Sequence, residues 1–385
     1  MATAHTTGKK HIYNKSMKHL SSIAAIIYLA SLSACGSSDM PVQYADSYGY
    51  ITFSAQSQKI LTRTNPYEAY NPERHPATMG IFGYQDNDAA NPIFHNETAT
   101  YNASTQSWPT ATQKRWADYP DASSFSFFAY MPQTEGAKLS KTVSGTYTLS
   151  FPFAMANGTS PVIFDTKAAP IICALPISKA GIDVENVDRL VDLKFDQTLT
   201  GYSLYFKLDA TMNAIRHFRI HSVTLSGYLA TSCTVSRSYT WSNATSSWSA
   251  QDIGWSDVQR STFVDTHIPY KSYEDNKTYY DDDTHTAIVT SAGYTQWGAD
   301  FYTIPDEAFT PDIKVTYDVE LIAEDGSTVV TRKGVTSKIT LNKKNFGNLT
   351  TGKTAMLNPI RILIQPHYLY VLADQDAYTG RLLID

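Results

Sequence analysis

The chain is poor in cysteine, in charged residues and in long hydrophobic runs. Its 385 residues include only 3 Cys, and only 17% of the residues are charged. So few thiols cannot build the disulfide framework of a small secreted domain. No apolar run reaches the roughly 20 residues that a transmembrane helix needs. The net charge of −5 brings no basic excess, which argues against a nucleic-acid partner.

Signatures of catalysis are also missing. The sequence contains no Gly-x-Ser-x-Gly, no His-Glu-x-x-His and no phosphate-binding glycine loop. His217 and His221 have the spacing of a zinc pair on a helix, but they flank "FRI" in a segment that alternates as a strand does. On a strand the two imidazoles would lie too far apart to share a zinc ion. We therefore predict no enzymatic activity, no metal site and no cofactor.

What the chain has in abundance is strand-forming residues. It holds 26 Tyr, together with many Thr and Ser, and aromatic and β-branched side chains pack well on a pleated sheet. Apolar and polar residues alternate in many segments, each of which predicts a strand with one buried face. Asp-Gly within "EDGS", 324–327, predicts a hairpin between two of them. Strands without long intervening helices predict an all-β fold of antiparallel sandwiches.

The composition divides this β-rich chain into two parts. Pro and Gly interrupt the alternation near 174–186. We predict an N-terminal β-sandwich over 48–178 and a C-terminal β-sandwich over 179–385. Between 230 and 300 the alternation dissolves into Trp, Ser, Tyr and Asp, which predicts a long loop insertion in the second sandwich.

The amino-terminal segment reads as an export signal. Four lysines precede an apolar stretch from Ile23 to Leu32, and small residues follow it up to Cys35. This layout is typical of a secretory signal peptide, here 1–34, and translation starts at either Met1 or Met17. "LSAC", ending at Cys35, resembles the bacterial lipobox, which implies a lipidated Cys35 at the head of a tether over 35–47. The alternative is an ordinary export signal that happens to contain a cysteine.

Three smaller features carry candidate chemistry. Trp241, Trp248 and Trp255 recur every seven residues, and exposed indoles stack on sugar rings. The alternative is a hairpin whose tryptophans cover the edge of the sandwich, and we favour it. An acidic run is a conceivable calcium site, although a solvated loop fits it better; its central residues are Asp281, Asp282 and Asp283. A disulfide between Cys173 and Cys233 is left open.

Several stretches together resemble one protein family. They are "YITFSAQSQKILTR" at 50–63, "MGIFGYQD" at 79–86, "RWADYPDASSFSFFAYMP" at 115–132 and "TTGKTAMLNPIRILIQP" at 350–366. These stretches resemble the fimbrillin family, the type V pilus proteins and related surface lipoproteins of Bacteroidetes. The chain departs from the family pattern after Phe195, where the usual histidine is missing. The resemblance implies two tandem transthyretin-like sandwiches, an outer-membrane lipoprotein at the cell surface or in a fimbrium, and a role in adhesion.

The resemblance also implies a route of assembly. In type V pilins a trypsin-like protease cuts after an arginine that follows the first strand, and Arg63 matches that position. Ile51 and Phe53 lie on the strand that would leave, and a strand from the next subunit would fill the groove.

The implied partners are other fimbrial subunits, the outer membrane through Cys35, and a glycan or protein on a host or bacterial surface. We therefore expect a fimbrial subunit, tip or anchor. The alternative is a monomeric glycan-binding surface lipoprotein.

Overall fold

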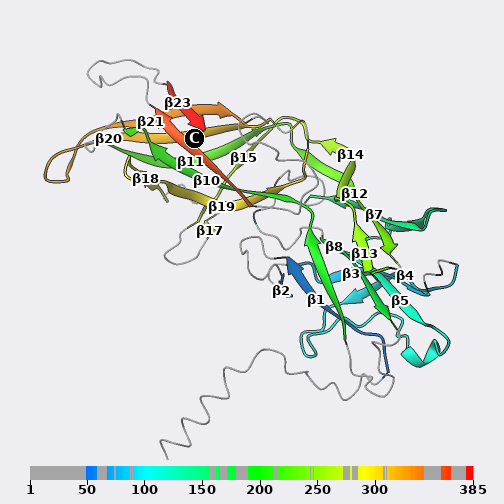
Figure 1. Cartoon of the computed structure of the whole chain (residues 1–385). Helices are drawn as coiled ribbons and strands as arrows, with labels where there is room; N and C mark the ends of the chain where they lie inside the picture. The colour runs from blue at the N-terminus through cyan, green and yellow to red at the C-terminus, as the bar shows by residue number, and fades with distance from the viewer. Residues whose placement is uncertain are drawn as a thin grey trace, which may run out of the picture. The chain divides into compact units, whose positions relative to one another are not determined.

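The computed structural model of the chain is built almost wholly of β-strands (Figure 1). A short 3-10 helix, η1, covers Trp116–Asp118. Residues 47–385 form one compact unit. The all-β prediction is confirmed. The residues described are 49–384, except 59–66, 73–74, 87, 89, 156–161, 163, 165–170, 179–189, 211–215, 243, 246, 272–277, 280–284, 307, 309, 342–356 and 366–378.

Hydrogen bonds join the strands into three large sheets. The first sheet has the order β2 (Tyr67–Ala69), β1 (Phe53–Gln58), β9 (Val191–Gln197), β8 (Ile171–Ser178), β5 (Ser124–Met131), β3 (Thr78–Gln85) and β4 (Pro92–Thr100). The second sheet contains β13 (Ser247–Ala250), β12 (Ala230–Ser242), β7 (Thr146–Ala154) and β6 (Lys138–Lys141), with β14 (Gly254–Arg260) paired to β12.

The third sheet is the largest. It has the order β15 (Val264–His267), β11 (Arg216–Gly227), β20 (Asp312–Ile322), β21 (Thr328–Thr340), β23 (Thr379–Ile384), β22 (Leu357–Gln365), β10 (Thr200–Leu208) and β19 (Thr295–Thr303), with β18 (Ala287–Val289) paired to β11. A separate small pair joins β16 (Tyr270–Lys271) and β17 (Thr278–Tyr279).

Among the described strands, most pairs are antiparallel, as predicted, but three are parallel. They are β1 with β9, β10 with β22, and β21 with β23. The predicted hairpin at "EDGS" is confirmed, because β20 ends at Ile322, β21 begins at Thr328, and Gly326 takes a φ of +81° in the turn. Parallel neighbours need long crossover connections, and this explains why local alternation did not reveal them.

The central strand β5 is buried on both faces, although its alternation predicted one buried face. Phe127 points into an N-terminal core that it shares with Phe53 and Leu193. Phe128 and Tyr130 point into an intersheet core, lined on its other side by β7 and β12 of the second sheet. The first sheet therefore lies between two apolar layers. The aromatic residues that interrupt the alternation of "SFSFFAYM" are the ones that fill the second layer.

The third sheet wraps around a core of its own. That core combines side chains of β10, β11, β20 and β22, among them Phe206, Phe218, Tyr317 and Ile362. The ends of the strand order also meet, because Thr295 of β19 donates a hydrogen bond to the Ile288 carbonyl of β18 at 3.2 Å, and β18 pairs with β11. A curved sheet of this kind encloses apolar residues without a second layer.

The long loop insertion expected over 230–300 is wrong for most of that region. Strands β12 to β19 occupy it, and β12 alone runs over thirteen residues. Cys233, Val235 and Tyr239 are buried, and Thr and Ser residues occupy the positions between them that face the other way. The high content of small hydroxyl residues hid this alternation in the sequence.

The predicted boundary between 178 and 179 stays a prediction. Strands on its two sides, β8 and β9, pair within the first sheet through Ile171 with Gln197 and Ile172 with Asp196.

Candidate functional site

The first strand, which the sequence resemblance singles out, has fully enclosed apolar side chains. Ile51, just before β1, is 1% exposed and Phe53 is 0% exposed. The Phe53 ring meets the rings of Phe94 and Phe127 edge-on, with centroids 5.9 and 5.3 Å apart. Burial of such a side chain contributes about 1.5–3 kcal/mol. The side chains of the first strand therefore fill part of the N-terminal core.

The backbone of β1 is held from both sides. It pairs in parallel with β9, from Phe53 opposite Val191 to Ser57 opposite Phe195, and in antiparallel with β2. The Trp108 N–H donates to the Phe53 carbonyl at 2.8 Å. On the polar side, Ser54 and Gln56 each donate to the Asp192 carboxylate, at 3.1 and 3.0 Å. The neighbouring strands, the contact with Trp108 and the hydrogen bonds to Asp192 together fix the position of β1.

Removal of β1 would open a slot of defined chemistry. The remaining strand contact of β9 within the described chain is with β8, and it involves only the far end of β9, at Asp196 and Gln197. Residues 191–195 would then present unpaired backbone groups beside Leu193 and Phe195, which are buried here. An edge of this kind is a template for another strand. The segment 191–195 and the N-terminal core beside it are called the first-strand slot below.

Several predicted site residues lie outside the described residues. They are Cys35, Arg63, the acidic residues Asp281, Asp282 and Asp283, and both candidate start methionines. Lipidation of Cys35, cleavage after Arg63 and the calcium site therefore stay predictions.

The three tryptophans lie on neighbouring strands of the second sheet. Trp241 of β12 is opposite Trp248 of β13, with ring centroids 5.3 Å apart. Trp248 packs on Phe128, 5.1 Å away, and Trp255 lies partly buried against the same intersheet core. Trp248 and Trp255 thus cover the sandwich, as the hairpin interpretation expects. The glycan-binding role stays a prediction, and Trp241, which is half-buried, is the residue on which it would depend.

His217 and His221 lie on strand β11, as predicted. His217 is opposite Glu320, and the Nε2 atom of His221 lies 2.9 Å from the Asp318 carboxylate. Among the described residues, no group of three or more His, Cys, Asp or Glu is placed to hold a metal ion. No helix in the described part of the chain is long and apolar enough to cross a membrane.

Cys233 carries a free, buried thiol. Burial raises the pKa of this thiol to about 12. The thiolate is the reactive form of cysteine, so Cys233 is inert at neutral pH.

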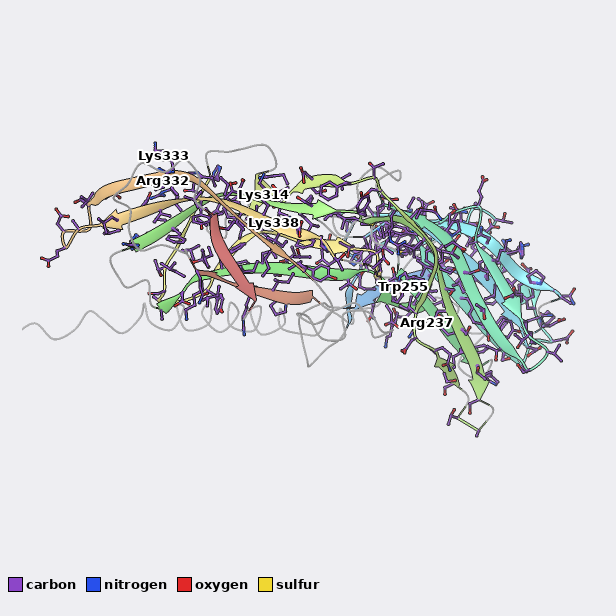
Figure 2. The ribbon with its side chains drawn as sticks, turned by 90° about the horizontal axis from the view of Figure 1, so that it is seen from above. Arg237, Trp255, Lys314, Arg332, Lys333 and Lys338 are labelled. Carbon is purple, nitrogen blue, oxygen red and sulfur yellow. The ribbon has the colours of Figure 1, made fainter. Side chains whose placement is uncertain are left out.

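An ion pair between two sheets was not predicted from the sequence. Arg237 of β12 contacts the carboxylate of Asp196 on β9, and its Nε donates to the Gln251 carbonyl at 2.9 Å. Both side chains are largely buried, at 13% and 16% exposed. Arg237 lies on the same face of β12 as the buried Val235 and Tyr239. A charged residue at this inward-facing position was the feature of the sequence that could have indicated the ion pair. Figure 2 labels Arg237 together with Trp255 of the neighbouring strand β14.

No protein-family model and no curated protein matches the chain. Among the solved structures that are similar to it over most of their length are three from Bacteroidetes.

The first is a fimbrial protein of Bacteroides vulgatus ATCC 8482, 17% identical, with 87% of this chain and 98% of the other covered at a TM-score of 0.44. The second, from Bacteroides uniformis ATCC 8492, was solved as a candidate cell adhesion protein and is 13% identical, with 89% and 99% covered at a TM-score of 0.35. The third is the fimbrial anchor protein Mfa2 of Porphyromonas gingivalis, 12% identical, with 87% and 96% covered at a TM-score of 0.29.

These structure neighbours are fimbrial and cell adhesion proteins. All three TM-scores lie below 0.5, so the proposals below rest on the residues of this chain.

Proposed function

We propose that the chain is a surface-exposed subunit, tip or anchor of a type V-like fimbrium that acts in adhesion. The observation that carries the proposal is the first-strand slot. One short segment near the amino end fills a core with Ile51 and Phe53, and its backbone completes the edge of β9. Together with the resemblance of the same segment to fimbrillins, this arrangement suits assembly by strand exchange.

Strand exchange needs an incoming strand that restores the apolar side chains and the backbone hydrogen bonds of β1. The donor must place apolar side chains at the positions of Ile51, Phe53 and Ala55, which alternate along the segment and are all buried. It must also pair with residues 191–195 of β9. Backbone hydrogen bonds supply affinity in such complexes, and the alternate side-chain pockets supply specificity.

The position in the fimbrium depends on whether β1 leaves. Cleavage after Arg63 would release β1 and produce a stalk subunit. A chain that retains β1 keeps its slot filled, and this fits an anchor tethered through a lipid on Cys35.

The amino terminus of the protein isolated from its own cells distinguishes these cases. A terminus at Thr64 is expected for a stalk subunit, and a lipidated Cys35 is expected for an anchor. In the stalk case Arg63→Ala abolishes high-mass polymers and leaves a full-length lipoprotein on the membrane. Arg74→Ala, which replaces another arginine of the same region, is the matched control and should polymerise normally.

One result would contradict fimbrial assembly altogether, namely a protein that is monomeric in membrane extracts and forms no complex with other fimbrial subunits. A different result would contradict the part given to the first-strand slot, namely normal assembly by a Phe53→Asp variant, because a carboxylate in place of the buried Phe53 ring should disrupt the slot.

A further inference from the structure

The outward face of the β20–β21 hairpin carries uncompensated positive charge on an acidic protein. Ile313, Val315 and Tyr317 of β20 point into the core of the third sheet. Side chains alternate between the faces of a strand, so Asp312, Lys314 and Thr316 point outward.

The same alternation applies to β21, where Val335 and Ile339 pack on the core. Thr336, Lys338 and Thr340 therefore share the outward face with their neighbours on β20.

Two lysines meet directly across this face. Lys314 pairs with Lys338 in the register of the two strands, and both are exposed. Like charges directly opposite each other destabilise a sheet. Asp312 relieves the repulsion only in part, because it binds the Lys338 ammonium at 2.8 Å and leaves Lys314 without a carboxylate.

Partial burial opposes ionisation of Asp312, but hydrogen bonds from Lys338 and Thr340 hold its pKa below the usual value. Asp312 is therefore ionised at neutral pH.

The other carboxylates of these strands are already engaged. Glu320 forms a two-point ion pair with Arg219, at 2.6 and 3.2 Å. Asp318 contacts His221 and accepts the Gly334 N–H at 2.9 Å. Asp325, in the turn, accepts from the Ser327 N–H and hydroxyl. None of these groups is left to neutralise Lys314.

A further exposed cation extends the charge along the hairpin. Lys333 is exposed on β21, five residues before Lys338. The strand register shifts between Tyr317 and Val319, so Arg332 lies opposite the core-packed Val319 and Lys333 lies on the outward face. Strands rise about 3.4 Å per residue. The cations therefore span roughly 15 Å along the strand. Figure 2 shows Lys314, Lys333 and Lys338 gathered along the hairpin, with Arg332 next to Lys333. Between them, Thr316 and Thr336 lie opposite each other and present hydroxyl groups.

We propose that this outward face of β20–β21, the basic hairpin face, binds an acidic polysaccharide chain. Its cations follow a line, which suits a linear polymer that carries repeated carboxylates or sulfates. The threonine hydroxyls between them can exchange hydrogen bonds with sugar hydroxyls. The alternating outward positions from Asp312 to Thr316 and from Thr336 to Thr340 hold no apolar side chain, whereas binding to a membrane surface would use apolar residues. The proposal does not depend on fimbrial assembly.

The test measures binding of the full chain to immobilised polygalacturonate and heparin at increasing salt. Wild-type protein should bind, and added salt should weaken binding because exposed charges are screened. The Lys314→Gln/Lys333→Gln variant should bind about tenfold more weakly, which corresponds to about 1.4 kcal/mol. The matched control, Lys138→Gln/Lys141→Gln, removes two exposed lysines from β6 and should bind as the wild type does.

A second variant tests the sign of the effect. Asp312→Asn releases Lys338 from its ion pair and adds positive charge to the face, so polysaccharide binding should become tighter. Loss of the folded structure would weaken binding instead. Thermal unfolding of each variant distinguishes a change in surface charge from a loss of the fold.

Three outcomes would overturn the proposal. They are no binding by the wild type, equal loss in the control, and equally tight lysine-dependent binding to poly-glutamate or to anionic lipid vesicles.

Discussion

At the scale of single residues, Phe127 is the aromatic side chain on which the N-terminal core converges. Its ring contacts those of Phe53, Phe94 and Trp116, at centroid distances of 5.3, 6.4 and 6.2 Å. Phe127→Ala should lower the free energy of unfolding by about 3–5 kcal/mol, because the cavity is enclosed on all sides. Urea denaturation measures the loss.

The matched control for Phe127 is Phe263, which is 55% exposed. Phe263→Ala should change the free energy of unfolding by less than about 0.5 kcal/mol. Similar losses in the two variants would show that Phe127 is not an enclosed core residue.

The ion pair between Arg237 and Asp196 makes a different prediction. Arg237→Ala leaves a largely buried carboxylate without its guanidinium and should cost about 3 kcal/mol. The double variant Arg237→Met/Asp196→Leu should recover most of that loss, because replacement of both charges removes the uncompensated one. A double variant as unstable as the single one would contradict this account, and thermal denaturation compares the two.

At the scale of the secondary-structure elements, a glycine fixes how closely β3 and β5 approach. A Cβ on Gly80 would lie less than 3.0 Å from two ring carbons and the hydroxyl oxygen of Tyr130. That ring cannot swing away, because its hydroxyl lies 2.7 Å from the Asn96 side-chain oxygen and accepts the Thr134 N–H at 3.0 Å.

Gly80→Ala should therefore destabilise the chain by about 2 kcal/mol, as overpacked cores do. Gly293→Ala is the control, because a Cβ there would meet no atom within 4 Å. Chemical denaturation measures the stability of both variants. Equal stability of the two would contradict the prediction and show that the Tyr130 side chain moves to make room for the methyl group.

Elements that form locally were the ones that the sequence predicted well. The hairpin at Asp325 and Gly326 depends on neighbouring residues. Apolar and polar residues alternate over 313–321, one of the segments with a strand pattern, and its residues Ile313, Val315 and Tyr317 lie in the core. Features that depend on residues far apart in the chain were not predicted from the sequence.

The second buried face of β5 exists because β7 and β12 cover it, and the slot around Phe53 exists because β9 arrives from far along the chain. No local pattern encodes such contacts. The candidate assembly site was found through resemblance, and its geometry came from the structure.

At the scale of the whole molecule, the predicted lipidation makes attachment to the membrane depend on Cys35. Cys35→Ala should release the protein from the membrane fraction, or leave it with an uncut signal, because the acceptor of the lipid is gone. Palmitate labelling followed by fractionation measures this result. Cys233→Ala, which removes a buried thiol, should keep both the label and the membrane location. A Cys35→Ala variant that still takes up palmitate would disprove lipidation at this position.

The parallel pairing of β1 with β9 also sets an order of events during folding. Ser54 and its partner Asp192 are 138 residues apart, and contacts between such distant residues form late because a long loop must close first. Strand β1 precedes β9 by more than a hundred residues and is nevertheless among the last strands to dock, after the strands between it and β9 have folded. A chaperone that shields exposed strands would have its longest opportunity at this slot.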